Sequence, residues 1–183
     1  MKDERVIIKL EPLTVDEVKL SKMAEWRNDP DNHGALRSYY PTHSALQKEW
    51  ARAVIADKTK AYYFISILGG TRDFIGYCGL DKIHEVNRTA ELSLLIDGDH
   101  QRRGIGTSAV EEILARAFEL LNINCVFIEA YLTDDRWQFW GKQGFKTEGV
   151  LRSRKYYNND YHNSVVASIL KEEWNERRTK STE

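Results

Sequence analysis

Gln101-Arg102-Arg103-Gly104-Ile105-Gly106 is the stretch of this sequence that says most about its fold. It lies between an apolar run, residues 92–96, and an amphipathic segment, residues 107–121, so it predicts a strand, a glycine loop and a helix. The first N–H groups of a helix have no intrahelical partner and carry the positive end of the helix dipole. Glycine keeps side chains away from those groups, and two arginines add positive charge. The loop therefore predicts a site for a ligand with several phosphates.

Two other interpretations of this loop stay open. A Gly-x-Gly between a strand and a helix is also a common turn, with its arginines simply solvated. Gly104-x-Gly106-x-x-Ala109 also fits a dinucleotide-binding fingerprint, with Glu129 near the expected distance for a ribose-binding acid. Residues 97–103 disfavour this interpretation, because a dinucleotide-binding strand runs almost directly into its first glycine. A Walker-type loop is excluded, since no Gly-Lys-Ser/Thr follows.

Length and composition limit the class of protein. The chain has 183 residues, which predicts one domain, residues 1–174, followed by a charged tail, residues 175–183. With 27 basic and 28 acidic residues the net charge is −1, so we expect neither nucleic acid nor a membrane surface as a partner. No apolar run is long enough to span a bilayer. The start of the chain resembles no signal peptide, and Cys78 and Cys125 lie in apolar stretches, which predicts a cytoplasmic protein with reduced cysteines.

The hydrophobic pattern predicts alternating strands and helices. We expect strands at residues 5–10, 61–68, 74–83, 88–96, 124–132, 145–151 and 161–170, with a turn at residues 69–73. The strands on either side of the 107–121 helix can pair in parallel, because that helix is long enough for a crossover. The segment from Glu172 onward is highly charged and is expected to fray.

The expected helices have recognisable caps and faces. Thr14 is expected to cap a helix that runs toward Arg27, and Ser44 and Gln47 have capping-box spacing at the start of a second helix. Thr133 or Asp134 is expected to cap a short helix that ends at Gly144. The second helix has an apolar face of Leu46, Trp50, Val54 and Ile55, and the 107–121 helix has one of Val110, Ile113, Leu114, Ala117 and Leu121, with an exposed pair of Glu112 and Arg116.

This element order resembles that of the GCN5-related N-acetyltransferase (GNAT) superfamily, and the resemblance covers nearly the whole chain. Its cofactor motif is matched by residues 101–106, and a later signature by residues 144–149. Residues 26–29, 149–152 and 171–174 are similar to the branch with ribosomal-protein N-terminal, spermidine and nucleotide-aminosugar acetyltransferases. The resemblance implies the GNAT acyl-CoA N-acyltransferase fold, a mixed α/β fold whose central sheet is mostly antiparallel with one parallel βαβ crossover.

The resemblance also implies a function and a site. An acetyl group would pass from acetyl-CoA to a primary amine of a peptide, polyamine or aminosugar, by direct attack in a ternary complex. Glu91 would act as the base through ordered water, unless it is a strand-edge residue paired with Arg88 or Lys82. The N–H of Ile96 would stabilise the oxyanion. The pantetheine arm would lie along Leu94, Leu95 and Ile96, and the loop that holds the pyrophosphate would comprise Gln101, Arg102, Arg103, Gly104, Ile105, Gly106 and Thr107.

The sequence departs from the family pattern at two positions. Trp140 stands where many members have a tyrosine general acid, and Thr133 stands where an asparagine is usual. Tyr131 and Tyr77 are alternative acids, although a thiol with a pKa of about 8.5 can leave unassisted. Because of Trp140, a catalytically weak acyl-CoA-binding sensor or scaffold is an alternative function, and a dinucleotide-binding oxidoreductase is a second one.

Two variable segments are expected to surround the acceptor amine, namely residues 28–50 and the hairpin at residues 152–162. Both are rich in tyrosine, and the hairpin also carries arginine and lysine. The histidines show no metal-ligand spacing, so we expect no metal. The amine, the acyl length and the oligomeric state, a homodimer included, are left open by the sequence.

Overall fold

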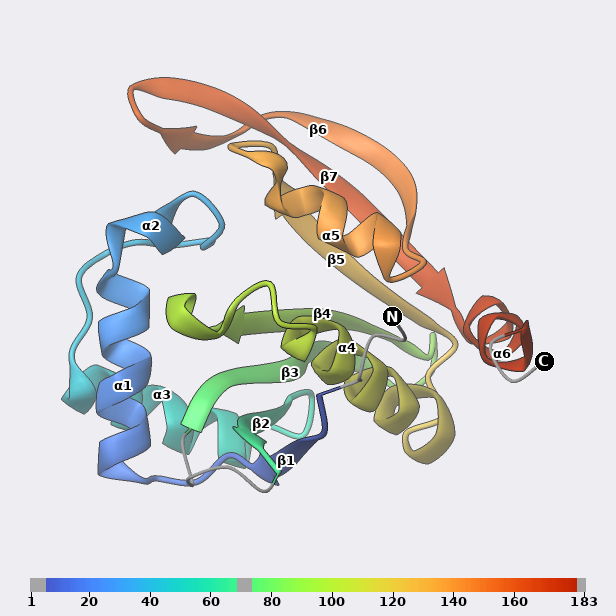
Figure 1. Cartoon of the computed structure of the whole chain (residues 1–183), viewed down its shortest axis with the longest axis horizontal. Coiled ribbons are helices and arrows are strands. Elements are labelled where there is room, and N and C mark those ends of the chain that lie inside the picture. Colours follow the sequence, from blue (N-terminus) through green and yellow to red (C-terminus); the bar gives the residue numbers. More distant parts are fainter. Residues whose placement is uncertain (1–5, 69–73, 181–183) are drawn as a thin grey trace.

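The computed structural model describes residues 6–68 and 74–180, and shows one seven-stranded sheet with helices on both faces (Figure 1). The strands lie in the order β1-β2-β3-β4-β5-β7-β6. They are β1 (Ile8–Pro12), β2 (Ala61–Ile67), β3 (Phe74–His84), β4 (Thr89–Ile96), β5 (Cys125–Tyr131), β6 (Lys146–Tyr157) and β7 (Asp160–Leu170).

One pair of described strands, β4 and β5, is parallel, and all other pairs are antiparallel. This confirms the predicted mixed α/β fold with a single βαβ crossover. A dinucleotide-binding domain needs an open, mostly parallel sheet, which this arrangement does not provide.

The helices divide between the two faces of the sheet. They are α1 (Glu17–Asn28), α2 (Pro30–His33), α3 (Ser44–Ala56), α4 (Ile105–Ala115), α5 (Gln138–Lys142) and α6 (Lys171–Lys180), and a π-helical segment, Arg116–Leu120, continues α4. One hydrophobic cluster joins α4 to the central strands through buried residues such as Ile113 and Ile128. A second cluster packs α1 and α3 on the opposite face, around Leu20, Trp26 and Phe64. Leu95 belongs to this second cluster, so alternate residues of β4 face different layers.

Several predicted element ends are wrong by a few residues. Asp16 caps α1, because its carboxylate accepts from the backbone N–H groups of Val18 and Lys19, whereas Thr14 does not. The cap residue of α3 is His43 without a side-chain hydrogen bond, so the Ser44 capping box does not form. The first strand begins at Ile8 and ends at Pro12. The expected turn at residues 69–73 lies outside the described residues.

The apolar faces are narrower than the sequence suggests. Leu46 is 45% exposed and Ile55 is 55% exposed, while Gln47, Ala51 and Val54 are the buried residues of α3. Leu121 is also 45% exposed, because the π-helical segment shifts the last turn of the predicted stripe. Within the described residues Glu112 and Arg116 form no ion pair. The Arg116 guanidinium instead lies 4.8 Å from the centre of the Tyr63 ring.

The segment that we expected to fray forms α6 and packs on the domain. Trp174 is 1% exposed, and its indole N–H donates to Glu111 Oε1 at 3.0 Å. Its ring lies 5.4 Å from that of Phe118. The single aromatic residue in a charged segment thus anchors the helix, although a charged composition alone predicts fraying. The division into a domain and a tail stays a prediction.

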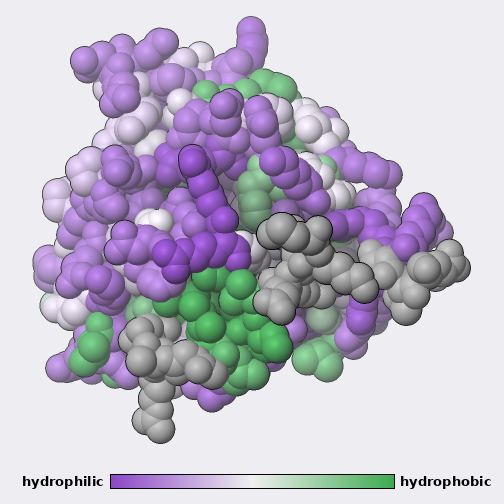
Figure 2. All heavy atoms as spheres, viewed as in Figure 1, coloured by the Kyte–Doolittle hydropathy of each residue, from purple (hydrophilic) through white to green (hydrophobic). Residues whose placement is uncertain are grey.

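Hydrophilic side chains cover most of the surface seen over α2 and the β6–β7 hairpin (Figure 2). Among the helices that the structure describes, none is long and apolar enough to cross a membrane.

Candidate active site

A cleft opens where β4 and β5 separate. The two strands pair only from Thr89 to Glu91 on β4 and from Cys125 to Phe127 on β5, and beyond these residues they diverge (Figure 1). The space between them is a cleft of about 380 Å³, lined from one side by β2, β3, β4 and the α1–α3 region and from the other by β5 and α5. Of the residues predicted for the site, Glu91, Leu94 and Leu95 are in the lining of this cleft, and Ile96 and the glycine loop follow it along the chain.

The divergence leaves backbone groups of β4 without a strand partner on the cleft side. The Asp97 N–H donates to the Ile75 carbonyl, and this bond shows which residues of β4 direct their backbone groups toward β3, because the direction alternates from one residue to the next. Residues 91, 93 and 95 therefore direct their N–H and C=O groups toward β3, and residues 92, 94 and 96 direct theirs toward the cleft. Of the three residues predicted to pair with an extended ligand, Leu94 and Ile96 are therefore the two whose backbone groups are directed toward the cleft. The carbonyl of Ile96 already accepts from Gln101 Nε2 at 2.9 Å, so the backbone N–H of Ile96 is the group left to bind an oxyanion.

The glycine loop ends in an exposed helix N-terminus. Gly104 has φ +78°, a left-handed conformation that glycine adopts without strain, and it is the residue before α4. The amide of Ser108 is bonded to the Gly104 carbonyl, so the amides of residues 105–107 precede the first bonded turn, and no side chain caps them. Arg102 and Arg103 are exposed beside them. A Cβ on Gly106 would lie 3.3 Å from the Phe139 ring, so this glycine lets α5 approach α4.

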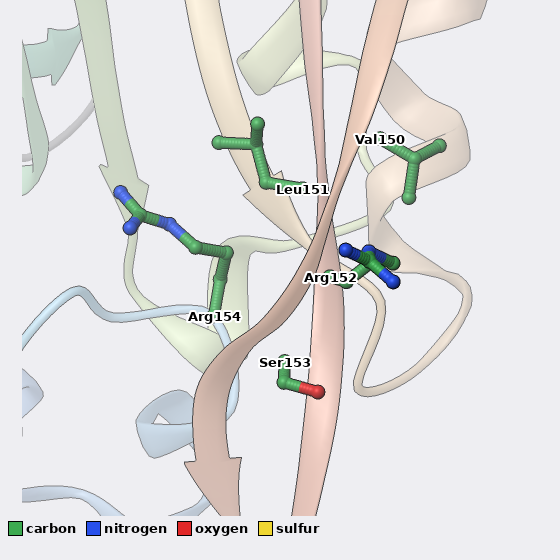
Figure 3. Close-up of a pocket in the computed structure, with 5 residues that line it drawn as sticks. All are labelled: Val150, Leu151, Arg152, Ser153 and Arg154. Atoms are coloured by element: carbon green, nitrogen blue, oxygen red, sulfur yellow. The ribbon is translucent and has the colours of Figure 1, made fainter.

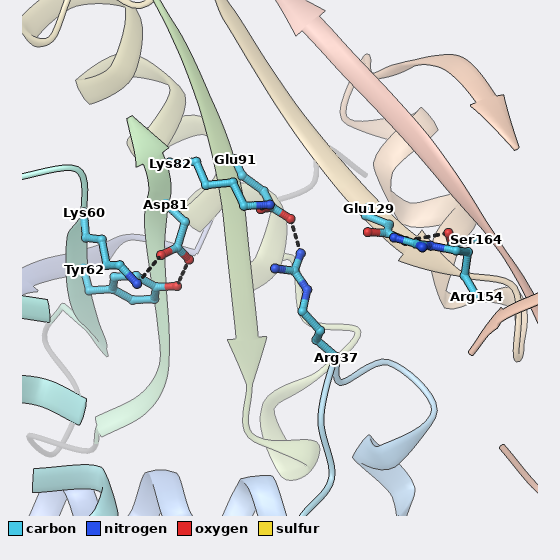
Figure 4. Close-up of polar contacts among 9 residues, drawn as sticks. All are labelled: Arg37, Lys60, Tyr62, Asp81, Lys82, Glu91, Glu129, Arg154 and Ser164. Carbon is cyan, nitrogen blue, oxygen red and sulfur yellow. Dashed lines mark hydrogen bonds and ion pairs between the residues drawn. The ribbon is translucent and has the colours of Figure 1, made fainter. Parts of the chain in front are cut away.

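Glu91 is buried in the cleft and paired with two cations. It is 3% exposed, it lies on a central strand rather than at an edge, and its Oε1 accepts from the Arg37 guanidinium (Figure 4). Lys82 Nζ lies 2.8 Å from Oε2, an ion pair whose angle does not make it a hydrogen bond. The predicted alternative in which Glu91 forms an ion pair with Lys82 is confirmed. The alternative with Arg88 is wrong, since Arg88 binds Asn122.

Arg37 connects Glu91 to the other wall of the cleft. Burial lowers the pKa of its guanidinium, but hydrogen bonding and charge from Glu91, with a hydrogen bond that the guanidinium donates to the Tyr131 side chain, outweigh this and raise that pKa. The loop between α2 and α3 carries Arg37, which is 54 residues before its partner, so no local pattern indicated it.

A second polar group lies on the β2–β3 wall. Tyr62 donates its hydroxyl hydrogen to Asp81, and Lys60 Nζ lies 3.3 Å from the same carboxylate (Figure 4). Burial, followed by the bond to Asp81, raises the pKa of Tyr62 well above its usual value. Tyr77 also lines the cleft. The sequence pattern did not indicate Tyr62 and Asp81 as part of the site, because alternation alone does not tell which tyrosines on a strand face a cleft.

The two segments expected around the acceptor do meet at the opposite end of the cleft. Tyr39 donates to the Tyr156 carbonyl at 2.8 Å, and the Lys155 ammonium donates to the Leu36 carbonyl. Lys155 is only 4% exposed, and its nitrogen lies 4.2 Å from the centre of the Tyr39 ring. Burial lowers the pKa of this ammonium. The loop before α3 and the β6–β7 hairpin thus contact each other next to Leu36 and Tyr131, two residues of the cleft lining.

Trp140 and Thr133 are both in the cleft wall, at the positions where the family pattern is not followed. Trp140 packs edge-on against Phe145, with ring centres 5.3 Å apart. Thr133 Oγ1 donates to the Gly34 carbonyl at 3.2 Å, which links the segment after β5 to the residue that follows α2. Both residues have structural contacts that account for them without catalysis.

A larger and shallower hollow lies elsewhere, on edge strand β6. It has a volume of about 570 Å³ and is lined by five consecutive residues, Val150 to Arg154 (Figure 3). The strand bulges there, with Ser153 at φ +51° and its amide bonded to the Asn163 side chain. Within the described part of the chain no other element lines this hollow, so the convergent polar groups of a binding site are missing there. In the described part of the chain, no three His, Cys, Asp or Glu side chains gather in a metal-ligand group.

A family model described as an acetyltransferase (GNAT) domain matches residues 8–138. The chain belongs to this GNAT family. A Bacillus subtilis protein provisionally named as a ribosomal N-acetyltransferase is 35% identical over 101 residues, which are 53% of this chain and 55% of that protein. The chain thus spans about half the length of this relative.

Other relatives are matched over more of their length. The spermidine N(1)-acetyltransferase of Escherichia coli K12 is 24% identical over 177 residues, 91% of this chain and 88% of that protein. The crystal structure of the spermidine N-acetyltransferase from Vibrio cholerae with CoA and spermine has a TM-score of 0.82 at 19% identity, and covers 91% of this chain and 97% of that one. At this identity the structural likeness establishes the GNAT fold and leaves the acceptor open.

Proposed function

We propose that this protein is an N-acetyltransferase that moves an acetyl group from acetyl-CoA to a primary amine. The observation that carries the proposal is the cleft between β4 and β5, which combines an unpaired strand edge with a buried carboxylate and leads toward an uncapped helix N-terminus. An extended, amide-containing arm that ends in a pyrophosphate fits this combination. Leu94 and Ile96 would pair with the arm, and the amides of residues 105–107 would bind the phosphates.

Glu91 is the residue proposed to take up the proton. A primary alkyl ammonium has a pKa of about 10, so it must lose a proton before it can attack at neutral pH. Both oxygens of Glu91 face cations, so the amine or a bridging water must displace Arg37 or Lys82 from the carboxylate. Both side chains are largely exposed, at 58% for Arg37 and 62% for Lys82, and Arg37 extends from a loop whereas Lys82 lies on β3.

The transfer itself needs few further groups. The amine nitrogen attacks the thioester carbonyl, the C–N bond forms and the C–S bond breaks. The sulfur leaves as a thiolate that takes up a proton from water, and the nitrogen releases its second proton to water and keeps one hydrogen as an amide. The Ile96 N–H would bind the carbonyl oxygen while it carries negative charge. Because a thiolate with a pKa of about 8.5 is a good leaving group, the proposal requires no general acid, and Trp140 does not contradict it.

A second candidate function is an acyl-CoA-binding sensor or scaffold without rapid turnover. Two observations favour it, namely Trp140 in the cleft wall and the two cations that already occupy Glu91. This function uses the same cofactor site as the first proposal, but it predicts that the protein binds acyl-CoA without transferring the acyl group to an amine.

Thermal unfolding tests the cofactor that both proposals share. Acetyl-CoA at about 100 times its Kd is expected to raise the Tm by roughly 5–10 °C, because a ligand that binds only the folded state stabilises it. NAD at the same concentration is expected to leave the Tm unchanged. A shift with NAD and none with acetyl-CoA would contradict the proposed cofactor site.

A further inference from the structure

Arg27 is a charged residue of the cleft that has no partner among the residues that the structure describes. It lies in the last turn of α1, its side chain is partly buried, and it lines the cleft with Arg37 and Glu91. Its Nε is buried and has no hydrogen-bond acceptor among the residues that the structure describes, and Arg27 forms no ion pair with any of them. Buried donors in native proteins are nearly always bonded, so this guanidinium is oriented for an acceptor that is not part of the described chain.

The carboxylates of the cleft, in contrast, are already neutralised. Four line it, and each lies within 4 Å of a basic side chain. Asp81 lies 3.3 Å from Lys60, Glu91 contacts Arg37 and Lys82, Glu129 lies 3.6 Å from Arg154, and Asp134 lies 2.6 Å from Arg136.

Lys155 adds positive charge at the acceptor end. It is buried between Tyr39 and Tyr131, and within the described residues it has no carboxylate partner. A polyamine keeps positive charges beyond the reacting amine and needs carboxylates to bind them. For such a ligand the cleft has paired carboxylates, the uncompensated Arg27 in its lining, and the charge of Lys155 behind the lining residues Leu36 and Tyr131, which together disfavour it electrostatically.

We propose that the acceptor is a primary amine that also carries an anionic group, a phosphate or a carboxylate, which Arg27 binds. The inference rests on the proposed acetyltransferase function and specifies its substrate class. An Arg fork binds either anion through two parallel hydrogen bonds, so the chemistry of recognition is shared by both. Binding the anion at Arg27 leaves the amine to reach Glu91 in the same cleft.

Matched acceptor pairs test this inference. Glucosamine and glucosamine 6-phosphate share one amine and differ by a phosphate, while the C-terminal amides of glycylglutamate and glycylglutamine share one amine and differ by a side-chain carboxylate. With wild-type protein, kcat/KM measured by thiol release is expected to be roughly 10-fold or more higher for the anionic member of at least one pair. The pair that shows the preference identifies whether the anionic group of the acceptor is a phosphate or a carboxylate. Spermidine is expected to be a poorer acceptor than either anionic probe.

Variants at Arg27 connect the preference to this side chain. Arg27→Gln is expected to raise KM for the preferred anionic acceptor roughly 10-fold or more and to remove the difference within the pair, with KM for acetyl-CoA unchanged. Arg27→Lys keeps the charge and is expected to restore part of the preference. Arg52→Gln is the matched control, since Arg52 is an exposed residue of α3 outside the cleft lining and should keep the wild-type preference. Because a cation in the last helical turn also stabilises the helix, Tm is measured for each variant.

The inference can fail alone or together with the proposed function. The inference alone fails if amines are acetylated without preference for the anionic members, if spermidine is the best acceptor, or if folded Arg27→Gln keeps the preference. If wild-type protein acetylates no amine, the proposed function fails and this inference fails with it.

Discussion

Replacing Glu91 with glutamine is expected to lower kcat/KM by about 100-fold or more, and to leave the affinity for acetyl-CoA nearly unchanged. The amide keeps the shape of the carboxylate but cannot accept the proton of the ammonium. The effect should appear in kcat/KM for the amine, and its pH dependence should weaken, because the group that takes up the proton is gone. Thiol release at several pH values measures both.

Two controls separate this role from a structural one. Glu91→Gln also weakens the ion pairs with Arg37 and Lys82, so circular dichroism and thermal unfolding must show that the variant is folded. Glu85→Gln removes the same charge at an exposed turn and should keep wild-type activity. If folded Glu91→Gln turns over amines at the wild-type rate, Glu91 is an ion-pair residue and the base lies elsewhere.

Gly104→Val is expected to weaken acetyl-CoA binding roughly 100-fold or more without unfolding the domain. A Cβ at this position meets no described atom within 4 Å, so the protein itself has room for the side chain. The φ of +78° is nevertheless a conformation that a β-branched residue strongly disfavours. The loop must therefore rearrange, and the amides of residues 105–107 lose their common direction. Isothermal titration with acetyl-CoA measures the loss.

Gly98→Val provides the matched control for this loop. A Cβ at Gly98 also meets no atom within 4 Å, and its φ is not positive, so the variant adds the same volume without the strain. Tight binding by both variants would show that the glycine loop is only a turn.

The element order was predictable because its signals are local. Gly104 shows this most clearly, since a glycine between an apolar run and an amphipathic segment predicted a turn into a helix, and the residue adopts the left-handed conformation there. The wrong caps have the same local origin. Asp16 and Thr14 are both good N-cap residues, and packing of α1 against α3 chooses between them by setting where the helix begins.

The missing parts of the site depend on contacts between distant residues. Arg37 reaches Glu91 from a loop with no regular structure, and Arg27 could not be placed in a cleft before the strands were known to diverge. Trp174 shows the same limit for the fold, because its burial against Phe118 and Glu111 is a tertiary contact. The charged composition predicted a frayed tail, whereas the contacts of Trp174 hold this segment against the domain as a helix.

The most direct test of the account is whether the protein transfers an acetyl group to an amine. We expect the wild-type protein to release CoA thiol from acetyl-CoA only when an amine is present, and mass spectrometry to find one acetyl group on that amine. The amines are those of the matched pairs together with spermidine, and folded Glu91→Gln is the reference for slow transfer. Acetyl-CoA binding with no acetylated amine from wild-type protein would contradict the account and support the sensor function.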